Sequence, residues 1–191
     1  MNIKDPKTGE RAKVPMYKVW AGMEEIYKSG KAKTIGISNF NVQLTLDLLT
    51  YAEIKPAVNQ IELHPYLPQV DAVEWFKKQE IIPVAYSPFV AHGNDAIHPD
   101  GKKKVLDDPL LGELATKYNK TKGQIALNWG LQRGHVVIPK SSNKGRQNEN
   151  LDCYSFKLEK EDVDKITALA CGFRNADTKH MAFADFTPLY D

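Results

Sequence analysis

The sequence predicts an α/β protein with a parallel β-sheet. Short runs rich in β-branched residues alternate along the chain with segments whose apolar residues recur at helical spacing. This alternation is typical of β-α units, in which each helix carries the chain back to start the next parallel strand. Hydrophobic residues make up 42% and charged residues 26% of the chain, as in an ordinary globular domain.

Four runs have the length and composition of strands. They cover residues 33–38 (KTIGIS), 56–63 (PAVNQIEL), 81–87 (IIPVAYS) and 135–139 (HVVIP). Each is followed by a helical pattern, which gives four strand-helix units. A closed eight-stranded barrel of this kind needs about 250 residues, with about 200 as its lower limit. The chain has 191 residues and half the strands of such a barrel.

The helices are predicted from apolar periodicity and from residues that favour helix ends. Gly30 stands in the position of a C-terminal cap, while Asn41 and Asp71 have the N-cap position of the next two helices. Thr121 and Gln124 have the spacing of a capping box. The apolar series are Val19, Met23 and Ile26; Leu44, Leu48 and Leu49; Val73, Trp75 and Phe76; Leu110, Leu111, Leu114 and Tyr118; residues 125–131; and Val163, Ile166 and Leu169.

We expect one domain over residues 1–191, because no linker, repeat or low-complexity tract divides the chain. Residues 1–13 are polar and rich in turn formers, which predicts a loop. A second loop is expected at residues 90–108, and loops of this length in compact domains are usually functional or disordered. Residues 172–191 form an irregular tail rich in aromatic residues.

Composition also excludes several classes of function. The chain has 26 Lys and Arg against 24 Asp and Glu, which disfavours binding to nucleic acid or to an acidic membrane surface. Its apolar runs are far shorter than the roughly 20 residues of a membrane helix. Its first residues do not form a secretory signal. Two cysteines, Cys153 and Cys171, are too few for a disulfide framework, so we expect buried thiols and a cytoplasmic location.

Three ordered stretches resemble the aldo-keto reductase family. They are residues 30–41 (GKAKTIGISNFN), residues 55–69 (KPAVNQIELHPYLPQ) and residues 136–150 (VVIPKSSNKGRQNEN), with AYSP at residues 85–88 between the last two. The resemblance runs from about residue 14 to the end of the chain and is closest to aldose and xylose reductases. It implies a (β/α)8 barrel that reduces aldehydes and ketones with NADPH. This chain would then hold strands five to eight, the C-terminal half, without strands one to four.

The ends of the first three predicted strands carry candidate nicotinamide ligands. Ser38, Asn39 and Gln60 offer hydroxyl and amide groups that can hold a carboxamide. Tyr86 offers an aromatic face for a flat ring. The resemblance assigns these residues to the nicotinamide of the cofactor. Without it, the spacing favours a turn and helix cap for Ser38 and Asn39, and Tyr86 is a core tyrosine.

The segment after the fourth strand predicts a phosphate site. Lys140 and Arg146 are cations beside the hydroxyl of Ser141, and Arg can hold a phosphate through two hydrogen bonds. The resemblance assigns them to the 2′-phosphate of NADPH, and assigns Glu149 and Asn150 to the adenine. It therefore favours NADPH, with NADH as the alternative cofactor. From the residues alone, a solvated basic turn is the other interpretation.

The resemblance also assigns Ser87 and Phe89 to the cofactor pyrophosphate. The chain departs from many relatives directly afterwards, because Val90 and Ala91 stand where Gly and Ser are common. Valine restricts the backbone where glycine would be permissive. The loop at residues 90–108 is long enough to fold over a cofactor, and we expect it to do so. The resemblance implies that residues 172–191 cover the barrel mouth and shape substrate choice.

We assign no catalytic and no metal-binding residue. The family's acid-base groups, a Tyr, a Lys, an Asp and a His, belong to strands one to four, and none has a counterpart here. His92 and His98 do not match a zinc motif. His64 is expected to be a hydrogen-bonded structural histidine.

The sequence therefore leaves two functions open. The first is the cofactor-binding half of an NADPH-dependent reductase for small carbonyl substrates, inactive alone. The second is a non-catalytic half barrel that binds a nucleotide or serves in assembly. In either case, four parallel strands form an open sheet with two exposed edges. We expect a missing N-terminal half, or self-association, to cover them.

Overall fold

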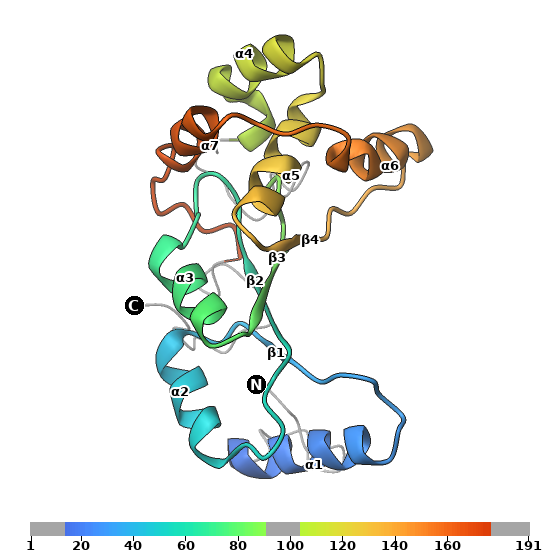
Figure 1. The fold of residues 1–191 in the computed structure, drawn as a ribbon, viewed down its shortest axis with the longest axis vertical. Coiled ribbons are helices and arrows are strands. Elements are labelled where there is room, and N and C mark those ends of the chain that lie inside the picture. The colour runs from blue at the N-terminus through green and yellow to red at the C-terminus, as the bar shows by residue number, and fades with distance from the viewer. Residues whose placement is uncertain (1–13, 91–103, 177–191) are drawn as a thin grey trace.

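The computed structural model describes residues 14–90 and 104–176. Its centre is a four-stranded parallel sheet in the order β1-β2-β3-β4 (Figure 1). The strands are β1 (Ile37–Ser38), β2 (Val58–Glu62), β3 (Ile82–Tyr86) and β4 (Val136–Val137). The predicted α/β class with a parallel sheet is confirmed, and spatial order follows chain order.

Helices make every connection between neighbouring strands. The α-helices are α1 (Met16–Lys28), α2 (Val42–Tyr51), α3 (Val70–Lys78), α4 (Pro109–Tyr118), α5 (Lys122–Gln132), α6 (Lys144–Leu151) and α7 (Lys160–Thr167). Two 3₁₀ turns, η1 (Val105–Asp107) and η2 (Asp152–Tyr154), precede α4 and follow α6. Helix α1 lies at one end of the molecule and α4 at the other (Figure 1).

The sheet is held mainly by the pairing of its two central strands. β2 and β3 share five residue pairs, whereas β1 and β4 each share two pairs with one neighbour. The outer strands are therefore shorter than the predicted runs at residues 33–38 and 135–139. Pairing does continue as single bonds beyond them, since Ala57 N–H donates to Ile35 O at 2.9 Å and Ile138 N–H donates to Ala85 O at 3.2 Å.

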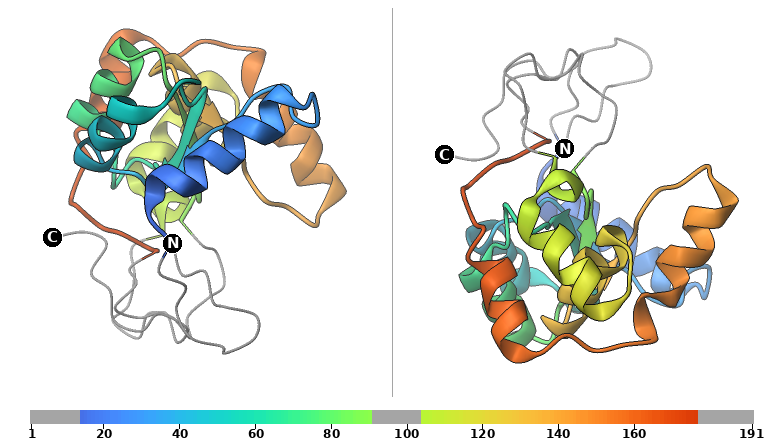
Figure 2. Two further views of the ribbon diagram at one scale, coloured as in Figure 1. Left: turned by 90° about the horizontal axis from the view of Figure 1, so that it is seen from below. Right: turned by 90° about the horizontal axis from the view of Figure 1, so that it is seen from above.

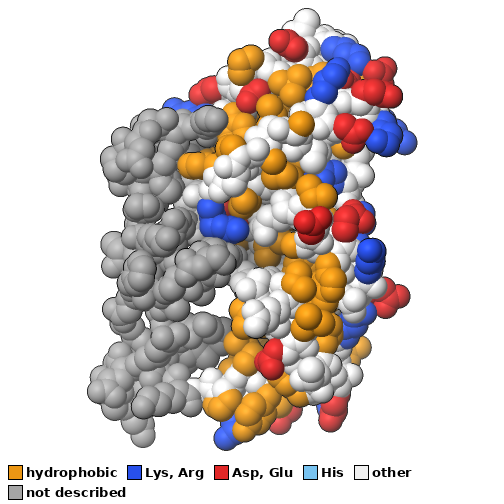
Figure 3. Space-filling view, turned by 90° about the vertical axis from the view of Figure 1, so that its left-hand side faces the viewer, with side chains coloured by type: hydrophobic (Ala, Val, Ile, Leu, Met, Phe, Trp, Pro, Cys, Tyr) orange, Lys and Arg blue, Asp and Glu red, His pale blue; other side chains and the backbone are white. Residues whose placement is uncertain are grey.

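The two faces of the sheet differ in burial. Ile61 of β2 and Ala85 of β3 are buried against Phe76 of α3. Because side chains alternate along a strand, Ile82 and Val136 point to the opposite face, where they are 49% and 43% exposed. Seen from the side of α2, α3 and α7, the surface mixes apolar with charged side chains (Figure 3).

Most predicted helix ends are confirmed. The Asn41 side chain accepts the N–H of Leu44, and Thr121 and Gln124 form both halves of the capping box. The N-cap prediction for Asp71 is wrong, because Gln69, in the left-handed conformation with φ of 40°, precedes the helix. Two residues of the apolar helical series are not buried: Ile26 and Leu44 are 42% and 48% exposed.

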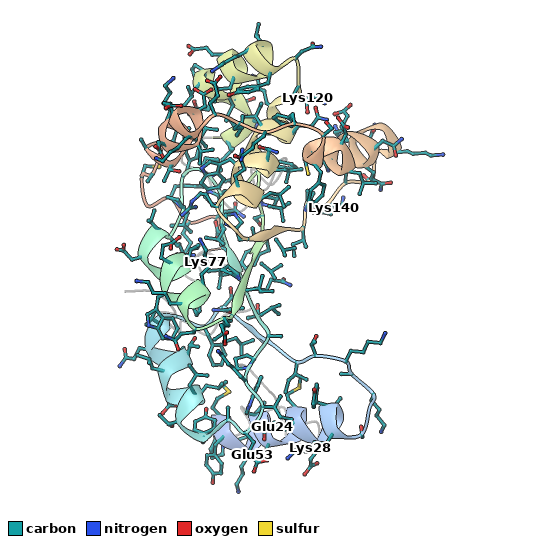
Figure 4. The ribbon with its side chains drawn as sticks, in the orientation of Figure 1. Glu24, Lys28, Glu53, Lys77, Lys120 and Lys140 are labelled. Atoms are coloured by element: carbon teal, nitrogen blue, oxygen red, sulfur yellow. The ribbon has the colours of Figure 1, made fainter. Side chains whose placement is uncertain are left out.

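A buried glutamate links α1 to the segment after α2 by hydrogen bonds. Glu24 is 6% exposed, and its Oε1 accepts the N–H groups of Glu53 and Ile54, both at 2.9 Å. Lys28 forms an ion pair with Glu53 at 2.7 Å beside it. Figure 4 shows the three labelled side chains gathered where α1 meets the segment after α2.

The two cysteines have different environments. Cys153 is buried at 2% exposure, as predicted, whereas Cys171 is exposed. The prediction of a second buried thiol is therefore wrong. Cys171 follows α7, and its backbone N–H donates to Tyr66 O at 3.1 Å.

Gly36 provides a test of the β1–β2 contact. A Cβ at this position would lie 2.5 Å from Val58 Cγ2 and 2.9 Å from Val58 O. We expect Gly36→Ala to lower the free energy of unfolding by about 1–3 kcal/mol through overpacking. Gly22, in α1, has nothing within 4 Å. Gly22→Ala should raise stability by about 0.5–1 kcal/mol. Urea unfolding monitored by tryptophan fluorescence measures both, and equal effects would contradict the close contact.

His135 predicts a loss of stability in mild acid. It is 2% exposed, and neither ring nitrogen has a partner among the described residues. Burial, with Arg133 and Lys77 nearby, lowers the pKa of His135 to about 3. The unfolded chain binds this proton near pH 6.5 and the folded chain does not. Stability should therefore fall from pH 6.5 downward, by about 1–2 kcal/mol at pH 5. Urea titrations of His135→Gln should lack this part of the pH slope.

Candidate functional site

The predicted nicotinamide ligands come together at one edge of the sheet. Ser38 ends β1, Gln60 lies within β2 and Tyr86 ends β3. Ser38 pairs with Gln60 in register, and its Oγ donates to Gln60 O at 2.9 Å. Asn39 N–H also donates to Gln60 O at 2.9 Å. Parallel strands place these groups at the same carboxyl edge, where ligands bind in α/β proteins.

Asn39 follows β1 in an unusual backbone conformation and has a buried side-chain oxygen. Its φ of 58° is left-handed, a conformation that asparagine tolerates better than most residues. Asn59 Nδ2 donates to Phe40 O at 2.8 Å and holds the turn from behind. The Oδ1 atom of Asn39 is buried and has no partner among the described residues. A buried acceptor of this kind can take an N–H from a bound carboxamide.

The segment after β3 is a strained turn. Ser87 and Val90 have φ values of 49° and 61°, and Val90 N–H donates to Ser87 O at 2.9 Å. A β-branched residue is a rare occupant of this conformation. Val90 is only 6% exposed and belongs to the core cluster around α5. Packing of the buried Val90 side chain offsets the strain of a backbone conformation that glycine would adopt freely.

Phe89 is placed by the same turn. Its ring packs at the start of α5, where a Cβ on Gly123 would meet Phe89 Cζ at 3.6 Å. The predicted cofactor-covering loop, residues 90–108, is described only at its two ends. There η1 buries Val105 completely, and the Asp108 side chain caps α4 by accepting Leu110 N–H.

The predicted phosphate ligands lie on α6 and on the chain that leads to it. Lys140 and Arg146 are exposed, and no ion pair engages either of them within residues 14–90 and 104–176. Ser141 Oγ accepts Asn143 N–H at 3.2 Å, and the Asn143 side chain caps the helix by accepting Arg146 N–H at 3.0 Å. Glu149 also lies on α6, three residues after Arg146.

Helix α6 buries none of its residues, and Asn150 near its end is only half-buried. Figure 2 shows α6 standing away from the body of the molecule in both views. Figure 4 places Lys140 between β4 and this helix. An exposed helix with unpaired cations leaves its first turn accessible to an anion.

A buried acid-histidine pair lies at the end of β2, where Glu62 pairs with Tyr86 of β3. Glu62 and His64 are both 0% exposed, and His64 Nε2 lies 2.8 Å from Glu62 Oε1. The prediction of a structural, hydrogen-bonded His64 is confirmed. The role of Glu62 was missed, because its other partners, the N–H groups of Asn175 and Ala176, lie more than a hundred residues away. Only the apolar context of the QIEL run hinted at its burial.

The described residues contain no cluster of three His, Cys, Asp or Glu side chains able to hold a metal ion. His92 and His98 lie outside the described residues, so their part of the metal prediction stays open. Among the helices of the described segments, none combines the length and apolar character needed to cross a membrane.

The sequence profile of the Aldo/keto reductase family matches residues 10–170. The chain belongs to the aldo/keto reductase family. It is 41% identical over 191 residues to a 4-dihydromethyl-trisporate dehydrogenase of Mucor mucedo, covering 99% of this chain and 59% of that protein. It is also 41% identical over 182 residues to aldose reductase B of Dictyostelium discoideum, covering 94% and 54% respectively.

Solved structures of aldo/keto reductases agree with this relationship. An aldo-keto reductase complexed with NADPH superposes with a TM-score of 0.86 and 35% identity, covering 100% of this chain and 57% of that one. A Bombyx mori aldo-keto reductase in complex with NADP gives a TM-score of 0.82 at 34% identity, covering 91% and 56%. The chain thus spans just over half the length of these aldo/keto reductases, and its four parallel strands correspond to about half of the barrel.

Asn39 allows its backbone and its side chain to be tested separately. Alanine disfavours the left-handed conformation and glycine does not. We expect Asn39→Ala to be less stable to urea than Asn39→Gly, by about 1 kcal/mol. Both variants lack Oδ1, so both should lose any ligand interaction that depends on it. Equal stability of the two variants would show that the backbone at Asn39 is not constrained as described.

Proposed function

We propose that this chain is the cofactor-binding, C-terminal half of an NADPH-dependent reductase that converts small aldehydes and ketones to alcohols. The observation that carries the proposal is the row of polar groups along the carboxyl edge of the sheet. Ser38 and Asn39 stand at the end of β1, Gln60 lies within β2 and Tyr86 ends β3. The cations before and on α6 follow β4, so the row keeps the spatial order of the strands. One end of this row suits an aromatic ring that bears a carboxamide, and the other end suits a phosphate.

The ring end fits nicotinamide in chemistry as well as position. The buried, unpartnered Oδ1 of Asn39 can accept a carboxamide N–H, and the Gln60 side chain is an amide able to give or accept a further bond. Tyr86 is half-buried at the end of β3, where its ring can pack on a flat aromatic face. These residues bind and orient; NADPH, when bound, supplies the hydride.

The phosphate end fits the 2′-phosphate that distinguishes NADPH from NADH. Arg146 can hold a phosphate through two parallel hydrogen bonds, and Lys140 adds a point charge. We assign Ser141 to the same phosphate, Glu149 and Asn150 to the adenine, and Ser87 and Phe89 to the pyrophosphate. NADH would lose the interaction with both cations and is the weaker ligand in this proposal.

Carbonyl reduction also needs a positioned proton donor, because hydride addition leaves charge on the carbonyl oxygen. We assign no such donor within this chain. The proposal places the acid-base residues in the part of the barrel that would contain strands one to four. Turnover therefore requires that part, whereas cofactor binding is a property to be tested on this chain.

The basic residues give the direct test. We expect Arg146→Met to weaken NADPH binding by about ten- to a hundredfold, the effect of one charge-assisted hydrogen-bonded pair. Lys140→Met should act in the same direction with a smaller factor. Affinity for NADH should stay unchanged in both variants. Titration of NADPH fluorescence against the chain measures these affinities, with circular dichroism to verify folding.

Lys144→Met is the matched control, because Lys144 is another exposed cation at the start of α6. General attraction between a basic helix and an anion would make all three variants equally weak. If NADPH and NADH bind the wild-type chain with the same affinity, the assignment of Lys140 and Arg146 to the 2′-phosphate is wrong.

A further inference from the structure

The chain after α7 runs antiparallel along the residues that follow β2. Cys171 N–H donates to Tyr66 O at 3.1 Å. The Phe173 ring lies 6.4 Å from the His64 ring, measured between centroids. Asn175 N–H donates to Glu62 Oε1 at 2.6 Å. Residues 171, 173 and 175 therefore contact residues 66, 64 and 62 in turn, which is the order expected of two antiparallel segments.

The last of these contacts is made by a side chain in place of a backbone carbonyl. Glu62 Oε1 accepts Asn175 N–H, and Glu62 Oε2 accepts Ala176 N–H at 2.8 Å. His64 Nε2, 2.8 Å from Oε1, supplies the third bond. Since an ionised carboxylate only accepts, this nitrogen carries the proton. A single buried carboxylate therefore joins strand β2 to two consecutive peptide groups of residues 171–176, the C-terminal strap.

The charge of Glu62 makes this junction strong. Burial on its own raises the pKa of Glu62, but the bonds from His64, Asn175 and Ala176 outweigh burial and hold that pKa below its usual range. The carboxylate is thus charged at neutral pH while fully buried. A buried charge that loses its partners is strongly unfavourable. The fold therefore resists any movement of the strap that would leave Glu62 without its two N–H donors.

The junction lies next to the candidate ring site. Glu62 pairs with Tyr86 in the β2–β3 register. Gln60 precedes Glu62 by two residues and so points to the same face of the sheet. The strap consequently crosses the carboxyl edge of the sheet beside two of the residues assigned to nicotinamide. The family match ends at residue 170, so the strap lies just beyond it.

We propose that Glu62, oriented by His64, is the anchor that fixes the path of the C-terminal strap across the ring end of the cofactor site. Glu62 is thus a positioning residue for that end of the site. The anchor itself follows from the contacts of residues 62–66 and 171–176. Its effect on the cofactor rests on the proposed function.

Limited proteolysis tests the anchor directly. Trypsin cleaves after Arg174, at the peptide bond whose own N–H is bound by Glu62. Glu62→Gln replaces one acceptor oxygen by an NH₂ group, which cannot accept a backbone N–H. Cleavage after Arg174 should become about ten- to a hundredfold faster, since it follows the population of the open strap. The rate is to be divided by that of cleavage after Arg133, which lies in the core region beside Trp129.

Asp162→Asn is the matched control. Asp162 is also a buried carboxylate, 1% exposed, but it links α7 to α4 through Lys117 and Tyr118. Its loss should destabilise the whole fold without favouring cleavage after Arg174 over Arg133. His64→Asn should raise the ratio in the same direction as Glu62→Gln, by a smaller factor. An unchanged ratio in Glu62→Gln, or a parallel rise at both sites, would overturn the anchor.

The positioning role has a separate readout. Adenosine 2′,5′-bisphosphate carries the 2′-phosphate of NADPH and lacks nicotinamide. Glu62→Gln should weaken NADPH binding several-fold and leave the affinity for the bisphosphate unchanged. Equal weakening of both ligands, or of neither, would refute the positioning role. If wild-type protein binds neither ligand, the proposed function fails, while the proteolysis ratio still decides whether Glu62 anchors the strap.

Discussion

The parallel pairing of β2 with β3 is the constraint on which the rest of the structure depends. Five residue pairs, from Val58 with Ile82 to Glu62 with Tyr86, set the register of the sheet. Parallel pairing requires a crossover for each strand, which the helices provide, and it brings all carboxyl ends to one edge. The candidate ring site exists because of this geometry. Ser38 and Gln60, far apart in the sequence, are neighbours only while β1 stays in register with β2.

Buried carboxylates hold the outer segments to this sheet. Glu24, Glu62 and Asp162 are each no more than 6% exposed. Glu24 accepts the N–H groups of residues 53–54, and Glu62 accepts those of residues 175–176. Buried carboxyl groups are tolerated in the interior only when hydrogen-bond donors surround them. Each therefore specifies one position for a segment that apolar packing alone would leave free to slide.

Local rules were sufficient where structure is set by near neighbours. The caps at Asn41 and Thr121 depend on contacts within one helical turn, and both are present. The face of a helix depends on what packs against it, which explains why Ile26 is exposed although its spacing is helical. Gln69 precedes α3 in the left-handed conformation and makes no side-chain cap bond. Its residue type therefore did not predict where the helix begins. Glu62 was beyond sequence reasoning because two of its donors are backbone groups, which carry no residue-specific signal.

The two faces of the sheet are covered to different extents. On the helix-covered face, Ile81 and Ala85 are completely buried. On the opposite face, Ile82, Val136 and Ile138 remain 49%, 43% and 42% exposed. Exposed apolar groups on one face favour association with a further element. In a barrel, that face is the interior, and a further set of parallel strands would cover it. The proposed function places the proton donor on those further strands, near the carboxyl edge that carries Asn39.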